Sequence, residues 1–237
     1  MILEVAELEK RFFLHRLARE VVAFRGLSFQ LAPGAFLLLA GPNGAGKSSL
    51  LRCLYRTYRP TAGRIRYRSL RGWLELAAAP DRLVLALRRE ELGYVSQFLD
   101  PRPRQTALEV VAEPLLWQGV EESVARRRAA EMLEAVGLRP ELWAAYPTPV
   151  AGGARQKVNL ARSLIRPYRL LLLDEPSASL DQEARAALRA WLGRLKQEGT
   201  AMIGIFHHPE DVAGLVDATL FLEGPYVAEP SAPGAAG

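Results

Sequence analysis

The sequence predicts an α/β fold in which helices cover both faces of a parallel sheet and a helical subdomain is inserted in mid-chain. Residues 36–40 and 170–173 are continuous apolar runs, as expected for strands buried on both faces. A glycine-rich segment and then a helical pattern at residues 49–58 follow the first run. Strands that alternate with helices imply crossover connections and therefore parallel pairing.

The middle of the chain makes the inserted subdomain, because its apolar residues recur at helical spacing. Helices are expected at residues 107–116, 122–136, 154–165 and 181–197; strands are expected at 2–8, 21–31 and 201–206, and short strands with a charged connector at 64–95. We expect one domain over residues 1–225, built from a catalytic lobe (1–97 and 167–225) and a helical subdomain (about 98–166), followed by a disordered tail at 226–237.

Composition narrows the possible classes of protein. Hydrophobic residues make up 49% and charged residues 24%, which is ordinary for a soluble globular protein. No apolar run approaches the roughly 18 residues of a membrane span, and the N-terminus lacks the pattern of a signal peptide, so we expect a cytoplasmic chain without membrane insertion. The net charge of +5 is scattered among acids, which argues against a nucleic-acid partner. Cys53 is the only cysteine; we expect a buried structural thiol.

A phosphate-binding loop follows the strand at 36–40. The pattern G-x-x-x-x-G-K-[ST] is matched in full, between a strand and a helix, by Gly41, Pro42, Asn43, Gly44, Ala45, Gly46, Lys47 and Ser48. Glycines let backbone amides converge on phosphate oxygens, and the helix N-terminus adds its positive dipole end. We expect Lys47 to reach the β- and γ-phosphates of ATP and Ser48 to ligate Mg²⁺, with Ser49 also in the site. The alternative is a glycine-rich turn with a chance lysine.

Two acids end the apolar run at 170–173. Asp174 and Glu175 would lie at the carboxyl edge of a parallel strand, where ligands bind in such sheets. We expect Asp174 to hold Mg²⁺ and Glu175 to orient or deprotonate the attacking water. Such a pair alone is weak evidence, but after a complete phosphate loop it indicates a nucleotide-hydrolysing site.

These motifs resemble those of the ATP-binding-cassette (ABC) ATPases, and further residues match that family in order. Gln97 is similar to the glutamine that senses Mg²⁺ and water, and His207 to the switch histidine that contacts the γ-phosphate. Phe12, in preference to Phe13, is similar to the aromatic residue that stacks on adenine. The resemblance implies an ABC-type P-loop ATPase, with an N-terminal antiparallel β-subdomain beside a mixed sheet that has a parallel core.

The resemblance also implies a head-to-tail, ATP-dependent homodimer. Ala151, Gly152 and Gly153 match the signature motif that meets the γ-phosphate of a second copy, and Asp181 ends a loop that links the two sites. The family normally has serine where Ala151 stands. A hydrogen bond to a charged group is worth roughly 1.5–3 kcal/mol, so its loss could slow closure or turnover on the order of 10–100-fold. We therefore expect slow hydrolysis.

Several segments are similar to the L-type ATP-binding proteins of the bacterial phosphonate carbon–phosphorus lyase system. They lie at residues 50–55, 72–80, 93–99, 158–162 and 204–207. This resemblance implies soluble lyase subunits as partners. Two alternatives remain: the ATPase of a membrane transporter, whose permease would contact residues 98–117, and a regulatory protein that binds ATP without hydrolysing it.

Overall fold

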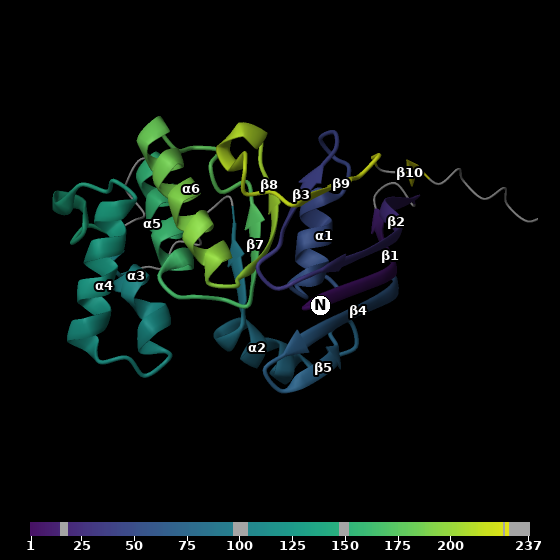
Figure 1. Ribbon diagram of the computed structural model, residues 1–237, viewed down its shortest axis with the longest axis horizontal. Helices are drawn as coiled ribbons and strands as arrows, with labels where there is room; N and C mark the ends of the chain where they lie inside the picture. The colour runs from purple at the N-terminus through teal and green to yellow at the C-terminus, as the bar shows by residue number, and fades with distance from the viewer. Residues whose placement is uncertain (15–18, 97–103, 147–151, 225, 228–237) are drawn as a thin grey trace, which may run out of the picture.

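The computed structural model describes residues 1–14, 19–96, 104–146, 152–224 and 226–227, which form two sheets and a helical lobe (Figure 1). The first sheet is antiparallel, with the order β10-β2-β1-β4-β5. Its strands are β1 (Leu3–Leu14), β2 (Arg19–Leu31), β4 (Ala62–Ser69), β5 (Gly72–Glu75) and β10 (Tyr226–Val227). Alternate residues of β4 are buried and exposed, as in a sheet with one face in the core.

The second sheet is parallel throughout, with the order β6-β7-β8-β3-β9. Its strands are β3 (Phe36–Ala40), β6 (Leu92–Val95), β7 (Leu170–Asp174), β8 (Ala201–Ile205) and β9 (Ala218–Phe221). Successive leucines of β7 point to opposite faces of the sheet and pack into two different hydrophobic cores. Leu170 and Leu172 belong to one core, and Leu171 and Leu173 belong to the other. Both faces are covered, which explains why the strand is apolar at every position.

Helices separate into those beside the sheets and those of the helical lobe. They are α1 (Lys47–Leu54), α2 (Asp81–Glu90), α3 (Ala107–Leu116), α4 (Glu122–Ala135), α5 (Gly152–Leu164) and α6 (Gln182–Gln197). Helix α1 packs between the two sheets, whereas α3, α4 and α5 pack on one another at the far side of the parallel sheet (Figure 1). Helix α3 is well defined at its start, because Thr106 and Glu109 form a capping box.

The predicted fold class is confirmed, and three details differ from the expectation. The antiparallel β-subdomain is present as expected, but the sheet beside it, expected to be mixed, has only parallel pairings among its described strands. The charged connector contains helix α2, whose buried face, Val84 and Leu87, is narrow, and that concealed its period in the sequence. Tyr226–Val227 belong to no disordered tail, because they pair with β2 at the edge of the antiparallel sheet; residues 228–237 lie outside the described part of the chain.

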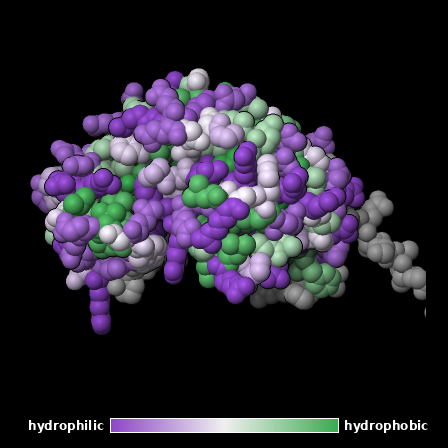
Figure 2. Space-filling view, turned by 60° about the horizontal axis from the view of Figure 1, so that its bottom comes forward, coloured by the Kyte–Doolittle hydropathy of each residue, from purple (hydrophilic) through white to green (hydrophobic). Residues whose placement is uncertain are grey.

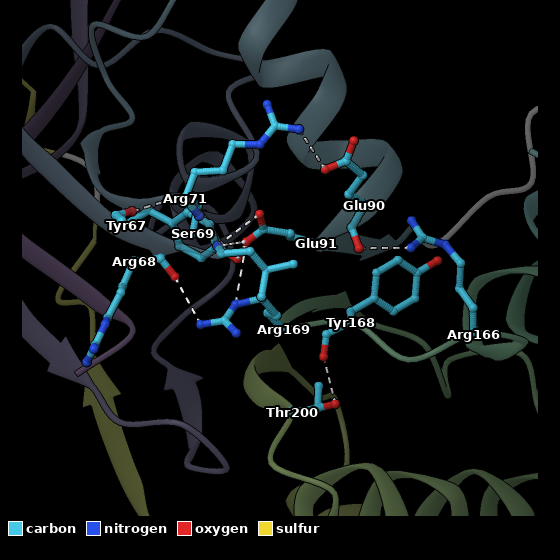
Figure 3. A network of polar contacts seen from close by, with 12 residues as sticks. Tyr67, Arg68, Ser69, Arg71, Glu90, Glu91, Arg166, Tyr168, Arg169 and Thr200 are labelled. Carbon is cyan, nitrogen blue, oxygen red and sulfur yellow. Dashed lines mark hydrogen bonds and ion pairs between the residues drawn. The ribbon is translucent and has the colours of Figure 1, made fainter. Parts of the chain in front are cut away.

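A buried carboxylate joins the two sheets at one corner (Figure 3). Glu91, 1% exposed, accepts hydrogen bonds from the Tyr67 hydroxyl at 2.9 Å and from the Leu70 amide at 3.2 Å. The Nε atom of Arg169 lies 3.5 Å from the same carboxylate. Glu91 precedes β6, Tyr67 belongs to β4 and Arg169 precedes β7, so this cluster fixes the antiparallel sheet against the parallel one.

The structure bears on two expectations from composition, the burial of Cys53 and the absence of membrane-spanning segments. Cys53 is fully buried on α1, and burial raises the pKa of its thiol to about 12, so it is a packing residue. In the described part of the chain, every helix is too short or too polar to cross a bilayer.

Candidate functional site

The phosphate loop lies between β3 and α1, as the sequence predicts. Its backbone requires glycine at two positions: a Cβ on Gly41 would overlap the carbonyl of Leu222, and a Cβ on Gly46 would overlap that of Ala23. Both residues also have positive φ, 133° and 86°. Gly46 is the N-cap of α1 and offers no side-chain cap, so the amides of the first helical turn are available to a ligand.

A cavity of about 300 Å³ opens beside this loop and is called here the loop cavity. It is lined by Phe12, Val21, Ala23, Glu175 and residues 43–49. The antiparallel sheet therefore supplies one wall and the phosphate loop the other. Phe12 faces the loop cavity, whereas Phe13 is 52% exposed and does not line it.

Lys47 lies over its own loop. Its ammonium donates hydrogen bonds to the carbonyls of Gly41 at 2.7 Å and Pro42 at 2.8 Å. Gly41 and Pro42 do not line the loop cavity, but their carbonyls hold Lys47 in place. The loop cavity is lined by the rest of the phosphate loop and the residue after it: Asn43, Gly44, Ala45, Gly46, Lys47, Ser48 and Ser49. A cation and free amides thus meet on one concave surface, which fits a polyphosphate.

The two acids occupy the positions expected for them. Asp174 ends β7, is 7% exposed, and accepts a hydrogen bond at Oδ1 from the Ser48 hydroxyl at 2.8 Å. A hydroxyl and a carboxylate in contact are the oxygen ligands that Mg²⁺ prefers, so this pair fits that ion. Glu175 follows with a positive φ of 53°, unusual outside glycine, and this turn directs its side chain into the loop cavity.

His207 follows β8, the neighbour of β7. Its Nε2 lies 3.0 Å from Oε2 of Glu175. Parallel strands bring their carboxyl ends to one edge of the sheet, and this brings the two residues together. The histidine side chain is about half exposed, at 51%, so it remains accessible to a ligand beside Glu175.

Tyr94 is a site residue that the sequence reasoning missed. Its hydroxyl donates to Oδ2 of Asp174 at 2.7 Å, so both carboxylate oxygens are held, one by Ser48 and one by Tyr94. Burial, followed by the negative charge of Asp174, raises the pKa of Tyr94, which keeps its hydroxyl protonated and donating. Only the pairing of β6 with β7 brings the two side chains together, and no motif in the sequence marks the tyrosine.

The signature residues lie apart from the loop cavity. Helix α5 begins at Gly152, and neither Gly153 nor Asp181 lines the cavity. Asp181 is the N-cap of α6, accepts from the Ala184 amide at 2.8 Å, and pairs with Lys157 of α5 at 2.7 Å. Gln97 and Ala151 fall outside the described residues.

Two buried polar residues of α5 also escaped the sequence analysis. Gln156 donates to the carbonyl of Pro176 at 3.1 Å, and Asn159 donates to the carbonyl of Ser96 at 2.6 Å. They connect the signature helix to the segments just after β7 and β6. Their signal in the sequence is weak: two amide side chains one helical turn apart in an expected helix.

Fold and site together define a P-loop ATPase of the ABC class, and comparison with known proteins gives the family. A family model described as ABC transporter matches residues 24–178. The chain belongs to this family, whose members hydrolyse ATP with Mg²⁺. The nucleotide-binding and ATPase predictions are thereby confirmed as class assignments.

Related proteins cover most of the chain. It is 36% identical to a lipoprotein-releasing system ATP-binding protein, LolD, of Maricaulis maris, over 95% of this chain and 97% of that one. It is 34% identical to the uncharacterized ABC transporter ATP-binding protein YvrO of Bacillus subtilis, over 86% of each chain. It is 37% identical to a methionine import ATP-binding protein, MetN, of Thermobifida fusca, over 86% of this chain and 62% of that one.

Solved structures share the fold. The dimeric ATP-binding cassette MJ0796 bound to ADP and Pi superposes with a TM-score of 0.84 and 24% identity over 94% of both chains. Another dimeric structure of MJ0796 gives 0.83 and 23% identity, over 97% of this chain and 100% of that one. At this level of identity the likeness defines the fold.

Proposed function

We propose that the loop cavity holds Mg²⁺–ATP, with Phe12 stacked on the base and the phosphate loop around the triphosphate. Lys47 binds the β- and γ-phosphates, for which it must leave one or both of the carbonyls it now contacts. Ser48 and Asp174 hold the metal, because the Ser48 hydroxyl oxygen and Oδ1 of Asp174 already lie 2.8 Å apart. The first-turn amides of α1 bind phosphate oxygens.

Hydrolysis is assigned to the residues at the carboxyl edge of the parallel sheet. Mg²⁺ held by Ser48 and Asp174 would supply positive charge that offsets the charge of the triphosphate. Glu175 orients the attacking water and accepts its proton at the carboxylate, and His207, 3.0 Å away, holds that carboxylate and reaches the γ-phosphate. Gln97 contributes to the metal and water positions.

The chain acts as a head-to-tail dimer. Ala151, Gly152 and Gly153 of one copy meet the γ-phosphate bound by the other. The position of Gly153 and Asp181 outside their own loop cavity supports this, because a single copy leaves the signature helix without a nucleotide. Asp181 joins the signature helix to α6 through Lys157, and so links the two sites.

We infer that the dimer drives a membrane transporter at the cytoplasmic face of the membrane. The lipoprotein-releasing and methionine-import names of its relatives favour this function over a role in phosphonate catabolism. The resemblance to the phosphonate-lyase proteins rests on short segments, several of which surround motifs that the whole family shares.

The structural observation that carries the transporter proposal is a groove between the two lobes, with a volume of about 540 Å³. It lies between α2 and β6 on one side and α3 and α5 on the other, and its lining includes the exposed side chains of Leu85 and Trp117. On the side of the molecule that carries α2 and β5, the surface is mostly hydrophilic and its hydrophobic side chains gather in separate patches (Figure 2). Exposed apolar side chains in a groove on a mostly polar surface favour a protein partner.

The positive charge of the groove favours a partner segment that carries acidic residues. The groove is lined by four arginines, Arg88, Arg89, Arg162 and Arg166, and Arg162 pairs with Glu113 at 3.1 Å. Arg166 donates to the carbonyl of Glu90 (Figure 3) and also to that of Arg88. A permease segment with acidic residues beside apolar ones therefore complements the groove.

Purification of the tagged chain from detergent-solubilised native membranes tests this proposal. We expect a membrane permease to co-purify, and Arg89→Glu to abolish the association without changing the ATPase rate of the isolated chain. Arg82→Glu is the matched control, because Arg82 is exposed on the same helix but does not line the groove. Co-purification of soluble subunits of a phosphonate-degrading enzyme, with no permease, would refute the transporter function.

A further inference from the structure

Tyr94 contacts Asp174, the carboxylate proposed to hold Mg²⁺, and also lines the groove. Its hydroxyl bonds to Oδ2 of Asp174 at 2.7 Å, and its side chain is among those that line the groove. In the part of the chain that the structure describes, it is the one groove-lining residue with a hydrogen bond to Asp174. The Tyr94 side chain therefore connects the groove proposed to bind the partner with the site proposed to bind the metal.

A second aromatic ring extends the contact toward the groove. The rings of Tyr55 and Tyr94 pack with centroids 5.0 Å apart and an interplanar angle of 37°. The guanidinium of Arg88 lies 4.3 Å from the centroid of the Tyr55 ring and donates to the Tyr55 carbonyl at 2.8 Å. Both Tyr55 and Arg88 line the groove, so its wall is in van der Waals contact with the side chain that holds Asp174.

The backbone of Tyr94 is held by strand pairing, so the ring is the part of this residue that can shift when a partner presses on the groove. Tyr94 lies opposite Leu172 in the parallel sheet, and β7 continues to Asp174, so the main chains of both residues are fixed by strand pairing. A shift of the ring then changes the distance between its hydroxyl and Asp174 while the backbone stays in place. A hydrogen bond to a charged group is short and directional, so a small displacement has a large effect on it.

We propose that Tyr94 is a positioning residue that orients the Asp174 carboxylate for Mg²⁺, and that the wall of the groove acts on the metal site through it. This rests on the proposed function, since it assumes that Asp174 holds the metal of bound ATP. The neighbours that orient a metal-binding group determine how ready it is for the ion. A partner segment that presses on the Tyr55 and Tyr94 rings would thereby change the affinity of the site for Mg²⁺–nucleotide.

The test separates metal affinity from nucleotide affinity. Binding of a fluorescent ATP analogue is titrated against Mg²⁺ and repeated in EDTA, with all variants in a Glu175→Gln background to suppress turnover. We expect Tyr94→Phe to raise the Mg²⁺ concentration at half-saturation by roughly 10–100-fold, the range for loss of an outer-shell partner. Nucleotide binding in EDTA should not change. Tyr55→Phe is the matched control, because it keeps the ring and removes only a hydroxyl.

A double-mutant cycle tests the connection to the groove. Tyr55→Leu removes the ring against which Tyr94 packs, so it should shift the Mg²⁺ dependence in the Glu175→Gln background but cause no further shift once Tyr94→Phe is present. Additive effects of Tyr55→Leu and Tyr94→Phe would overturn the coupling. An unshifted Mg²⁺ dependence in Tyr94→Phe, or an equal loss of affinity in EDTA, would overturn the positioning role. Absence of Mg²⁺-dependent binding in the Glu175→Gln chain with both tyrosines intact would instead refute the proposed site.

Discussion

Replacement of Phe12 by alanine tests the assignment of the base-binding residue. Phe12 lines the loop cavity and Phe13 does not, although they are neighbours on β1. Stacking of a base on an aromatic ring is worth roughly 1–3 kcal/mol, which corresponds to a roughly 5- to 150-fold rise in Kd. We expect Phe12→Ala to weaken ATP and GTP alike, because every base presents a π-face.

The contacts of Phe12 within the protein set the cost to stability. Its ring meets Tyr58 edge-on at 5.3 Å, and the ammonium of Lys10 lies 4.8 Å from the ring centroid. Together these contacts contribute roughly 1–2 kcal/mol, so the variant should remain folded at room temperature. Thermal unfolding monitored by circular dichroism verifies this before binding is measured.

Calorimetric titration with ATP and Mg²⁺ gives the result, and Phe13→Ala is the control. Phe13 is about half exposed, so its loss should leave Kd close to that of the parent chain. The reasoning is refuted if Phe13→Ala weakens binding as much as Phe12→Ala does. It is also refuted if the folded Phe12→Ala chain binds ATP with the parental Kd.

Three further predictions concern hydrolysis, the signature motif and pH. Glu175→Gln should retain ATP and trap the dimer, seen by light scattering as an ATP-dependent doubling of mass; a monomer under these conditions contradicts the dimer proposal. Ala151→Ser should raise the steady-state ATPase rate by roughly 10-fold or more, from a hydrogen bond worth roughly 1.5–3 kcal/mol; an unchanged rate contradicts the role given to this position. The pKa of Asp181 is lowered by the hydrogen bond from Lys157 and then by that from the Ala184 amide, below its ordinary value of 3.8. The stabilisation is therefore complete above that ordinary value and is lost as pH falls through the lowered pKa. The difference in Tm between the parent and Asp181→Asn, which keeps a capping side chain, should be small because the carboxylate is more than half exposed, and should vanish in acid. A difference that persists there argues against an electrostatic origin.

Backbone geometry explains why the phosphate loop could be predicted from sequence. Its chemistry comes from contiguous amides, glycines and the first turn of a helix, so the order of residues 41–48 is itself the arrangement. The buried strands at 36–40 and 170–173 were equally clear, because burial on both faces requires an unbroken apolar run. Helix α2 was missed because its apolar residues, 83–87, form one unbroken run without helical spacing, and only Val84 and Leu87 of them are buried.

The sequence by itself determined the fold class, the phosphate loop and the acids at the end of β7, since each is encoded in a short continuous segment. Only the tertiary structure decided which of Phe12 and Phe13 faces the loop cavity, and it alone brought Tyr94 to Asp174. It also formed the groove, from helices and strands far apart along the chain. The physical reason is that these contacts depend on strand register and on the packing of two lobes, which short segments of sequence do not encode.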